Sequence, residues 1–118
     1  MNVINFFIQL QSQFRILHWQ TTSFARHKAY ELTYDSVVEL ADRFIEAYQG
    51  KYGRLKADKT VEFANINDDT LDGFLDEALK TLLDDKALGI EEKDVDLKTI
   101  RDEVVEALNK LKYLLTLS

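Results

Sequence analysis

The chain has 118 residues, a net charge of −6 at neutral pH, 46% hydrophobic residues and 31% charged residues. This length and composition fit one folded domain, residues 1–118, around a single hydrophobic core. The acidic balance argues against nucleic-acid binding, which needs clustered lysine and arginine. The absence of cysteine excludes disulfides and thiolate metal sites and fits a reducing compartment, so we expect a cytoplasmic location.

The N-terminal segment, residues 1–19, is apolar but is interrupted by glutamines and an arginine. It has neither a basic start nor a long uninterrupted apolar run, so we expect neither a signal peptide nor a membrane span. Its apolar residues recur at alternating spacings of four and three, which predicts a helix over residues 2–19. The members of this apolar seam are Val3, Phe7, Leu10, Phe14 and Leu17.

A second helix is predicted over residues 24–49, after the possible N-cap hydroxyls of residues 21–23 and before Gly50 and Gly53. A connector of nearly twenty residues follows. Within it, the segment KTVEFANI predicts a short extra helix, because a structureless loop of that length is unusual in a compact domain. The core stripe of the second helix is Tyr30, Tyr34, Val37, Ala41, Phe44 and Tyr48.

Two further helices are predicted over residues 71–86 and 97–117 from the same apolar periodicity. No segment alternates with the period of a strand, and the chain has no proline to break long helices. The sequence therefore predicts an all-α fold, an antiparallel four-helix bundle with a short extra helix between the second and third helices.

One narrow face of the second helix carries most of its acids together with a histidine. On a helical wheel, His27, Glu31, Asp42 and Glu46 fall within an arc of about 100°. Helices often have acidic solvated faces, which is the ordinary interpretation. However, His18 lies just across the turn from His27, and imidazole together with carboxylate is a ligand set that suits iron, zinc or manganese.

Distance decides how such a site would be built. His27 and Asp42 are separated by roughly 22 Å along a helix, so they cannot bind one metal within a single chain. Two copies of the second helix that pack antiparallel across a two-fold axis would bring them together. One chain would then supply His18, His27 and Glu31, and its partner would supply Asp42 and Glu46.

In this region the chain resembles the Dps family, the mini-ferritins. The resemblance rests on His18-Trp19 at the end of the first helix, on His27 and Glu31, and on Asp42 and Glu46. It implies a ferritin-like bundle with a ferroxidase site at a dimer interface, built from both chains as above and with Trp19 beside it.

The resemblance also implies a reaction and an assembly. Two Fe(II) ions would be oxidised, usually by hydrogen peroxide rather than dioxygen, and the ferric mineral would be stored inside a shell of usually twelve subunits. The chain has no lysine-rich tail at either end, so the DNA binding of that family is not expected.

Two other interpretations remain open. The chain could be a catalytically silent helical bundle that only assembles, or that binds another helix through apolar surface such as that of Phe6, Phe7 and Phe14. Alternatively, the shared site could hold structural zinc at the dimer interface, because histidine and carboxylate ligands accept zinc readily.

Overall fold

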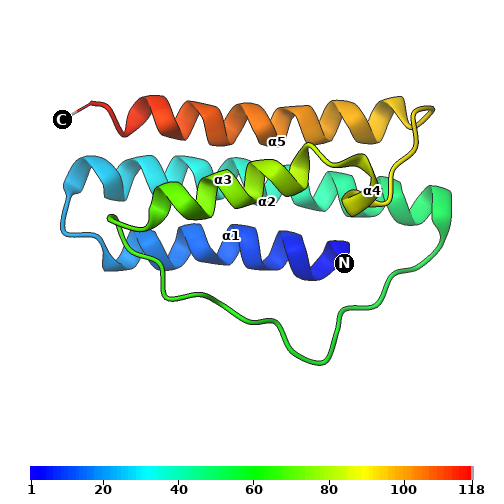
Figure 1. The fold of residues 1–118 in the computed structure, drawn as a ribbon, viewed down its shortest axis with the longest axis horizontal. Helices are drawn as coiled ribbons and strands as arrows, with labels where there is room; N and C mark the ends of the chain where they lie inside the picture. Colours follow the sequence, from blue (N-terminus) through cyan, green and yellow to red (C-terminus); the bar gives the residue numbers. More distant parts are fainter. Residues whose placement is uncertain (118) are drawn as a thin grey trace.

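The computed structural model describes residues 1–117, and Ser118, the last residue of the predicted domain, lies outside the described residues. Within this range the chain is helical and contains no strand, which confirms the all-α class. The elements are α1 (Val3–Gln20), α2 (Phe24–Tyr52), α3 (Leu71–Leu82), α4 (Asp85–Leu88) and α5 (Val95–Leu114) (Figure 1).

The four longer helices form a bundle, and α4 is a single turn at one end of it (Figure 1). Helix α2 packs against α1 and α5, and α5 also packs against α3. An edge-to-face contact between Phe14 and Phe74, with ring centroids 5.8 Å apart, connects α1 to α3. None of the helices within residues 1–117 combines the length and apolar character that crossing a lipid bilayer requires.

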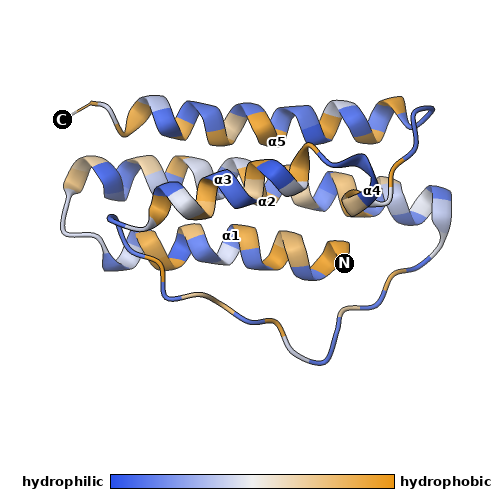
Figure 2. Cartoon of the chain, in the orientation of Figure 1, coloured by the Kyte–Doolittle hydropathy of each residue, from blue (hydrophilic) through white to orange (hydrophobic). Residues whose placement is uncertain are grey.

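The core of the bundle follows the predicted apolar seams. All five members of the α1 seam are buried, and hydrophobic residues colour much of α1 in Figure 2. In α2, the rings of Tyr30 and Phe44 are fully buried, and Phe44 lies 5.2 Å from Phe7 between ring centroids. Tyr34 and Tyr48 of the predicted stripe are only half-buried, because they lie at its edges.

The start of α2 was predicted closely and its end was not. The Ser23 hydroxyl caps α2 by accepting a hydrogen bond from the Arg26 amide, within the predicted capping segment. The helix then passes through Gly50 and ends at Gly53, whose φ of 91° suits glycine. The extra turn carries Lys51 and Tyr52, whose side chains hydrogen-bond to Asp94 at the start of α5. These tertiary contacts extend the helix past Gly50.

The single helix predicted over residues 71–86 is wrong, because the chain turns between α3 and α4. The Asp84 carboxylate accepts hydrogen bonds from the amides of Lys86 and Ala87 and so starts the new turn. Gly89 ends it with a φ of 70°, and an added Cβ there would lie 2.7 Å from the Tyr48 hydroxyl. Helix α5 starts two residues before the predicted position 97 and ends three before 117.

The short helix predicted in the connector is also wrong. Residues 59–66 contain no helix, and the connector runs along α1 in an irregular, largely extended path (Figure 1). Amide side chains along one face of α1 donate hydrogen bonds to the backbone carbonyl groups of the connector. Because side chains satisfy these carbonyls, the connector does not need a helix to do so. The donor–acceptor pairs are Asn2 to Lys56 (2.6 Å), Asn5 to Thr60 (3.2 Å), Gln9 to Glu62 (2.9 Å) and Gln13 to Ala64 (3.0 Å).

The end of the connector is clamped to the turn between α1 and α2. The Asp68 carboxylate accepts hydrogen bonds from the Thr21 hydroxyl at 2.8 Å and from the Tyr30 hydroxyl at 2.6 Å. Burial, and then the hydrogen bond to Asp68, raise the pKa of Tyr30 to about 12. These hydrogen bonds fix the turn that lies between the two histidines.

Candidate metal centre

The two histidines of the chain stack on each other where α1 turns into α2. Their ring centroids lie 3.7 Å apart, and their planes are inclined by 18°. The bonds of the two rings are reciprocal. His18 Nδ1 lies 2.8 Å from the carbonyl oxygen of His27, and His27 Nδ1 lies 2.7 Å from the carbonyl oxygen of His18. The fold therefore brings these two predicted ligands together within one chain.

These bonds fix the hydrogen position on both rings. A carbonyl oxygen only accepts, so each Nδ1 must donate, and in the neutral ring the lone pair is then on Nε2. Within residues 1–117 neither Nε2 has a hydrogen-bond partner, and neither is a fully buried atom, so solvent reaches both nitrogens. Metal-binding histidines commonly donate their second nitrogen to a carbonyl in this way, which orients the ring and fixes the tautomer.

Glu31 lies one helical turn beyond His27 and is half-buried. Its carboxylate is 3.9 Å from the Lys28 ammonium group, in a pair whose two side chains are 58% and 41% exposed. Exposed pairs of this kind contribute little free energy. The pair with Lys28 therefore does not hold the Glu31 carboxylate firmly in place.

Asp42 and Glu46 form the second group of predicted ligands. Both are exposed, and they lie one turn apart on α2. Hydrogen bonding to Asp42, and then the charge of Asp42, raise the pKa of Glu46 above its ordinary value. No lysine or arginine within the described residues forms a salt bridge with either carboxylate, so a bound cation would stabilise the pair.

The two groups are far apart within one chain. The rise of an α-helix puts His27 and Asp42 at roughly 22 Å from each other. In addition, residues 1–117 hold no group of three or more histidine, aspartate or glutamate side chains that could bind a metal, so Glu31 does not complete a site with the two histidines within one chain. The groups nevertheless lie on one strip of α2, which we call the α2 strip. Its members are Phe24, His27, Lys28, Glu31, Asp35, Val38, Asp42, Ile45, Glu46 and Gln49.

Trp19 lies next to His18 in the sequence but points largely into solvent, with 70% of its surface exposed. The Arg15 guanidinium group lies 5.7 Å from the centre of the Trp19 ring and 4.0 Å from the centre of the Tyr34 ring. Together with Phe24, which is 75% exposed, Trp19 gives the histidine end of the hairpin an uncovered aromatic surface. The sequence analysis assigned no role to Phe24.

A second acidic cluster, at the other end of α2, was missed by the sequence analysis. Asp94 is 1% exposed and accepts hydrogen bonds from the Tyr52 hydroxyl (2.5 Å), the Lys51 ammonium group (3.1 Å) and the Glu91 amide (2.9 Å). Lys51 also binds Asp96. Nothing in the sequence links Asp94 to residues 51 and 52, because the two segments meet only when the bundle forms.

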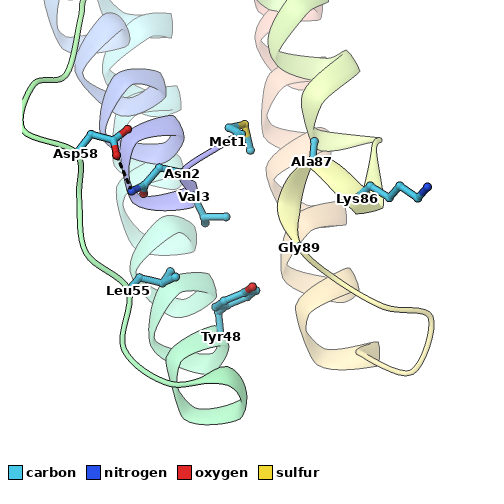
Figure 3. Close-up of a pocket in the computed structure, with 9 residues that line it drawn as sticks. All are labelled: Met1, Asn2, Val3, Tyr48, Leu55, Asp58, Lys86, Ala87 and Gly89. Carbon is cyan, nitrogen blue, oxygen red and sulfur yellow. Dashed lines mark hydrogen bonds between the residues drawn. The ribbon is translucent and has the colours of Figure 1, made fainter.

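A pocket of about 510 Å³ opens near this end of the bundle, away from the histidines. It lies between the start of α1, the C-terminal part of α2, the first residues of the connector, and α4 with the glycine that follows it (Figure 3). Asp58 of its lining is engaged by Asn2, and the Lys86 side chain points outward (Figure 3). Only the Tyr48 hydroxyl is directed across it, toward Gly89, so the pocket lacks the convergent polar groups that orient a ligand.

Comparison with known proteins assigns the chain to a family. The family of unknown function DUF5856 matches residues 18–115, which include both histidines, all of α2 and the end of α5. The chain therefore belongs to this family. No Dps or ferritin-like family is found, so the proposed membership of the Dps family was wrong. The resemblance rested on a few polar residues at helical spacing between His18 and Glu46, a pattern too short to define a family.

The chain is also similar to a protein of Enterobacteria phage T4, described as an uncharacterized 14.6 kDa protein in the mobD-ri intergenic region. The two are 28% identical over 107 residues, which cover 91% of this chain and 80% of the phage protein. No solved structure matches the chain.

Proposed function

We propose that two copies of the chain pair through the α2 strip and bind Fe(II) between them. The observation that carries this proposal is the histidine pair, because both rings are fixed by carbonyl groups with an unpartnered Nε2. One protomer would supply His18, His27 and Glu31. The other would supply Asp42 and Glu46, and the two-fold symmetry would create two equivalent sites.

The positions of the ligands along α2 support one register of pairing. His27 and Glu46 are equally distant from the midpoint between Ser36 and Val37. Glu31 and Asp42 are also equally distant from that point. If two α2 helices cross antiparallel with the two-fold axis there, the same register puts the partner's Glu46 opposite His27 and the partner's Asp42 opposite Glu31.

The surface around these ligands is suited to contact. Phe24 is largely exposed, and Val38 and Ile45 are half-buried on the same strip. Trp19 lies at the adjoining end of α1 and is also exposed. Exposed aromatic side chains lose apolar surface to a partner at little conformational cost, so they favour an interface at this face.

The proposed reaction is the oxidation of Fe(II), with iron as the substrate. Two ferrous ions each give up one electron to hydrogen peroxide, its O–O bond breaks, two protons are taken up, and two water molecules and two ferric ions form. Imidazole and carboxylate ligands suit iron and also admit zinc or manganese. Dioxygen is the second oxidant of the proposal. A twelve-subunit shell was implied by the Dps resemblance alone and is no longer proposed.

A ferritin-like arrangement of the bundle and a cytoplasmic location belong to the same proposal. The single long crossover, residues 53–70, supports the former, because ferritin-like bundles contain one such connection. The absence of cysteine supports the latter.

Ferric absorbance tests the activity. Protein loaded anaerobically with Fe(II) is mixed with peroxide, and the wild type is compared with an Asp42→Ala, Glu46→Ala variant. A Glu92→Ala, Glu106→Ala variant serves as the matched control, because it removes two exposed acids outside the α2 strip. We expect fast oxidation by the wild type and the control and only the background rate with the first variant. Equal rates for all three proteins would refute the proposed catalysis.

Structural zinc at the same site is the second candidate, and the fixed Nε2 atoms favour it equally. The two functions differ in redox chemistry, because zinc does not change its oxidation state in proteins. If the protein binds zinc tightly through His27 and Asp42 but does not accelerate Fe(II) oxidation, the site is a structural metal site and not a ferroxidase site.

A further inference from the structure

The first part of the connector is attached to the bundle with little apolar contact. This segment, residues 54–65, which we call the strap, lies along α1 (Figure 1). None of its side chains is buried, and only Leu55 and Val61 are half-buried. It begins after Gly53 at the end of α2 and ends before Ile66, which is 6% exposed. The strap therefore runs between two anchored ends without a hydrophobic anchor of its own.

The bonds that hold the strap come mainly from amide side chains. Three of the four hydrogen bonds that its carbonyl groups accept from α1 are exposed to solvent. In the other direction, the Asp58 amide donates to Asn5 Oδ1 at 3.0 Å, and the Leu55 amide donates to Gln49 Oε1 at 3.0 Å. Water can replace bonds of this kind, so each stabilises the attached strap only modestly.

The fourth of these amides, Gln13, is different because it is only 1% exposed. Its Nε2 donates to the carbonyl oxygen of Ala64 at 3.0 Å, which fixes the orientation of the amide group. Its Oε1 is buried and has no hydrogen-bond partner within residues 1–117. A buried acceptor without a partner costs free energy, so the side chain that binds the strap also opposes its attachment.

We propose that the strap detaches from α1 as one unit while the helical bundle stays folded, and that Gln13 controls its release. Detachment lets water reach Gln13 Oε1. It leaves the packing between the helices in place, because α2 contacts α1 and α5 directly. Segments with few buried apolar contacts open at a lower free energy than the core of a protein. This inference is independent of the proposed metal site.

Detachment of the strap changes the surface of α1. A cavity of about 320 Å³ lies between the strap and α1, and Asp58, Val61 and Glu62 form its wall on the side of the strap. Without that wall, the face of α1 that carries Asn5 and Gln9 is uncovered. The strap therefore controls access to amides that bind main-chain carbonyl groups.

Hydrogen exchange of the full chain, followed by NMR, tests this inference. The reporter is the Asp58 amide, because its acceptor is Asn5 and not Gln13. In the wild type, its protection against exchange should be at least about 100-fold lower than that of the Phe44 amide in the core of α2.

Two variants of Gln13 should shift the reporter in opposite directions. Gln13→Met removes the unpartnered oxygen and keeps an unbranched side chain, so exchange of the Asp58 amide should become several-fold slower. Gln13→Glu buries a carboxylate beside the Ala64 carbonyl group, so exchange should become at least about tenfold faster. Gln11→Glu is the matched control, because Gln11 lies on α1 but is not among the amides that bind the strap. Far-UV circular dichroism establishes that each variant is folded.

The outcomes separate the parts of the inference. Exchange of the Asp58 amide that neither Gln13 variant alters overturns release as one unit. A wild-type Asp58 amide as well protected as that of Phe44 overturns detachment from a folded bundle. Faster exchange in Gln13→Met, or equal acceleration in Gln13→Glu and Gln11→Glu, overturns the control by Gln13.

Discussion

The acidic cluster at the contact between α2 and α5 and the acidic pair on the α2 strip contain carboxylates in opposite states. Near the C-terminal end of the helix, Asp94 is buried and accepts three hydrogen bonds, and Lys51 lies between it and Asp96. On the α2 strip, Asp42 and Glu46 are exposed and have no cation within the described chain. The first cluster has its cation and its hydrogen-bond donors within the chain, and the second has no cation partner within residues 1–117.

The pKa values follow this difference. Hydrogen bonds from Tyr52, from the Glu91 amide and from Lys51 lower the pKa of Asp94 to about 2, whereas Asp42 raises the pKa of Glu46. A carboxylate whose charge is satisfied stabilises the fold, and one whose charge is opposed destabilises it. The comparison teaches that the Asp94 cluster, which we call the closed cluster, stabilises the structure, whereas Asp42 and Glu46, the open cluster, oppose each other's charge without a cation partner in the described residues.

The largest expected effect comes from opening the closed cluster. Asp94→Ala removes the acceptor of three hydrogen bonds and leaves Lys51 and the Tyr52 hydroxyl without their buried partner, so we expect the melting temperature to fall by several degrees. Asp42→Ala, made on the open cluster, should not lower it. Differential scanning calorimetry measures both variants, and equal losses would remove the distinction between the clusters.

The pH dependence of stability should have opposite signs at the two clusters. The folded pKa of Asp94 is depressed, so its contribution is complete above its ordinary value of 3.8 and is lost as the pH falls toward about 2. The folded pKa of Glu46 is raised, so its contribution is present below its ordinary value of 4.5 and is lost as the pH rises through the raised pKa.

Urea unfolding between pH 2 and pH 7 checks these signs. The difference between wild type and Asp94→Asn should shrink as the pH falls below 3.8, and Glu46→Gln should gain stability relative to wild type as the pH rises above 4.5. The account fails if Glu46→Gln is less stable than wild type at pH 7.

A smaller effect is expected at the histidine pair. His27→Phe keeps a ring to stack on His18 but removes the bond to its carbonyl oxygen, so the free energy of unfolding should fall by only about 1 kcal/mol. Metal binding should nevertheless be lost. Calorimetric titration with Mn(II) and urea unfolding give the two values, and unchanged Mn(II) affinity would exclude His27 as a ligand.

The smallest effect concerns the one lysine of the α2 strip. Lys28→Ala breaks an exposed pair with Glu31, so the free energy of unfolding should change by less than about 0.5 kcal/mol. Mn(II) affinity should rise, because Glu31 is freed and a positive charge is removed. A fall in affinity would show that Lys28 supports the site rather than competing with it.

The sequence predicted the helices because their apolar spacing records which face is buried. The seam of α1 and the cap at Ser23 are examples, since both depend on residues close together in the chain. The connector was mispredicted for the opposite reason. Its path depends on amides of α1 about fifty residues away, such as Gln9 and Gln13, which no local pattern reveals.

The candidate site was predictable only in part. The turn between the helices was enough to indicate that His18 and His27 approach each other. Their stacking and the reciprocal bonds to carbonyl oxygens depend on backbone geometry and could not be read from residue types. The Asp94 cluster depends on the meeting of α2 with α5, so it was invisible until the fold was known.

The central claim is that one metal site takes ligands from two chains, and mixing two defective variants tests it most directly. His27→Ala lacks the proposed histidine ligand near the N-terminal end of α2, and the Asp42→Ala, Glu46→Ala variant lacks the proposed carboxylate ligands in its C-terminal half. Each mixed dimer would contain one intact site, so Mn(II) binding and Fe(II) oxidation should return on mixing although neither variant alone shows them. Native mass measurement establishes whether mixed dimers form. If they form but remain inactive and bind no Mn(II), the claim is contradicted.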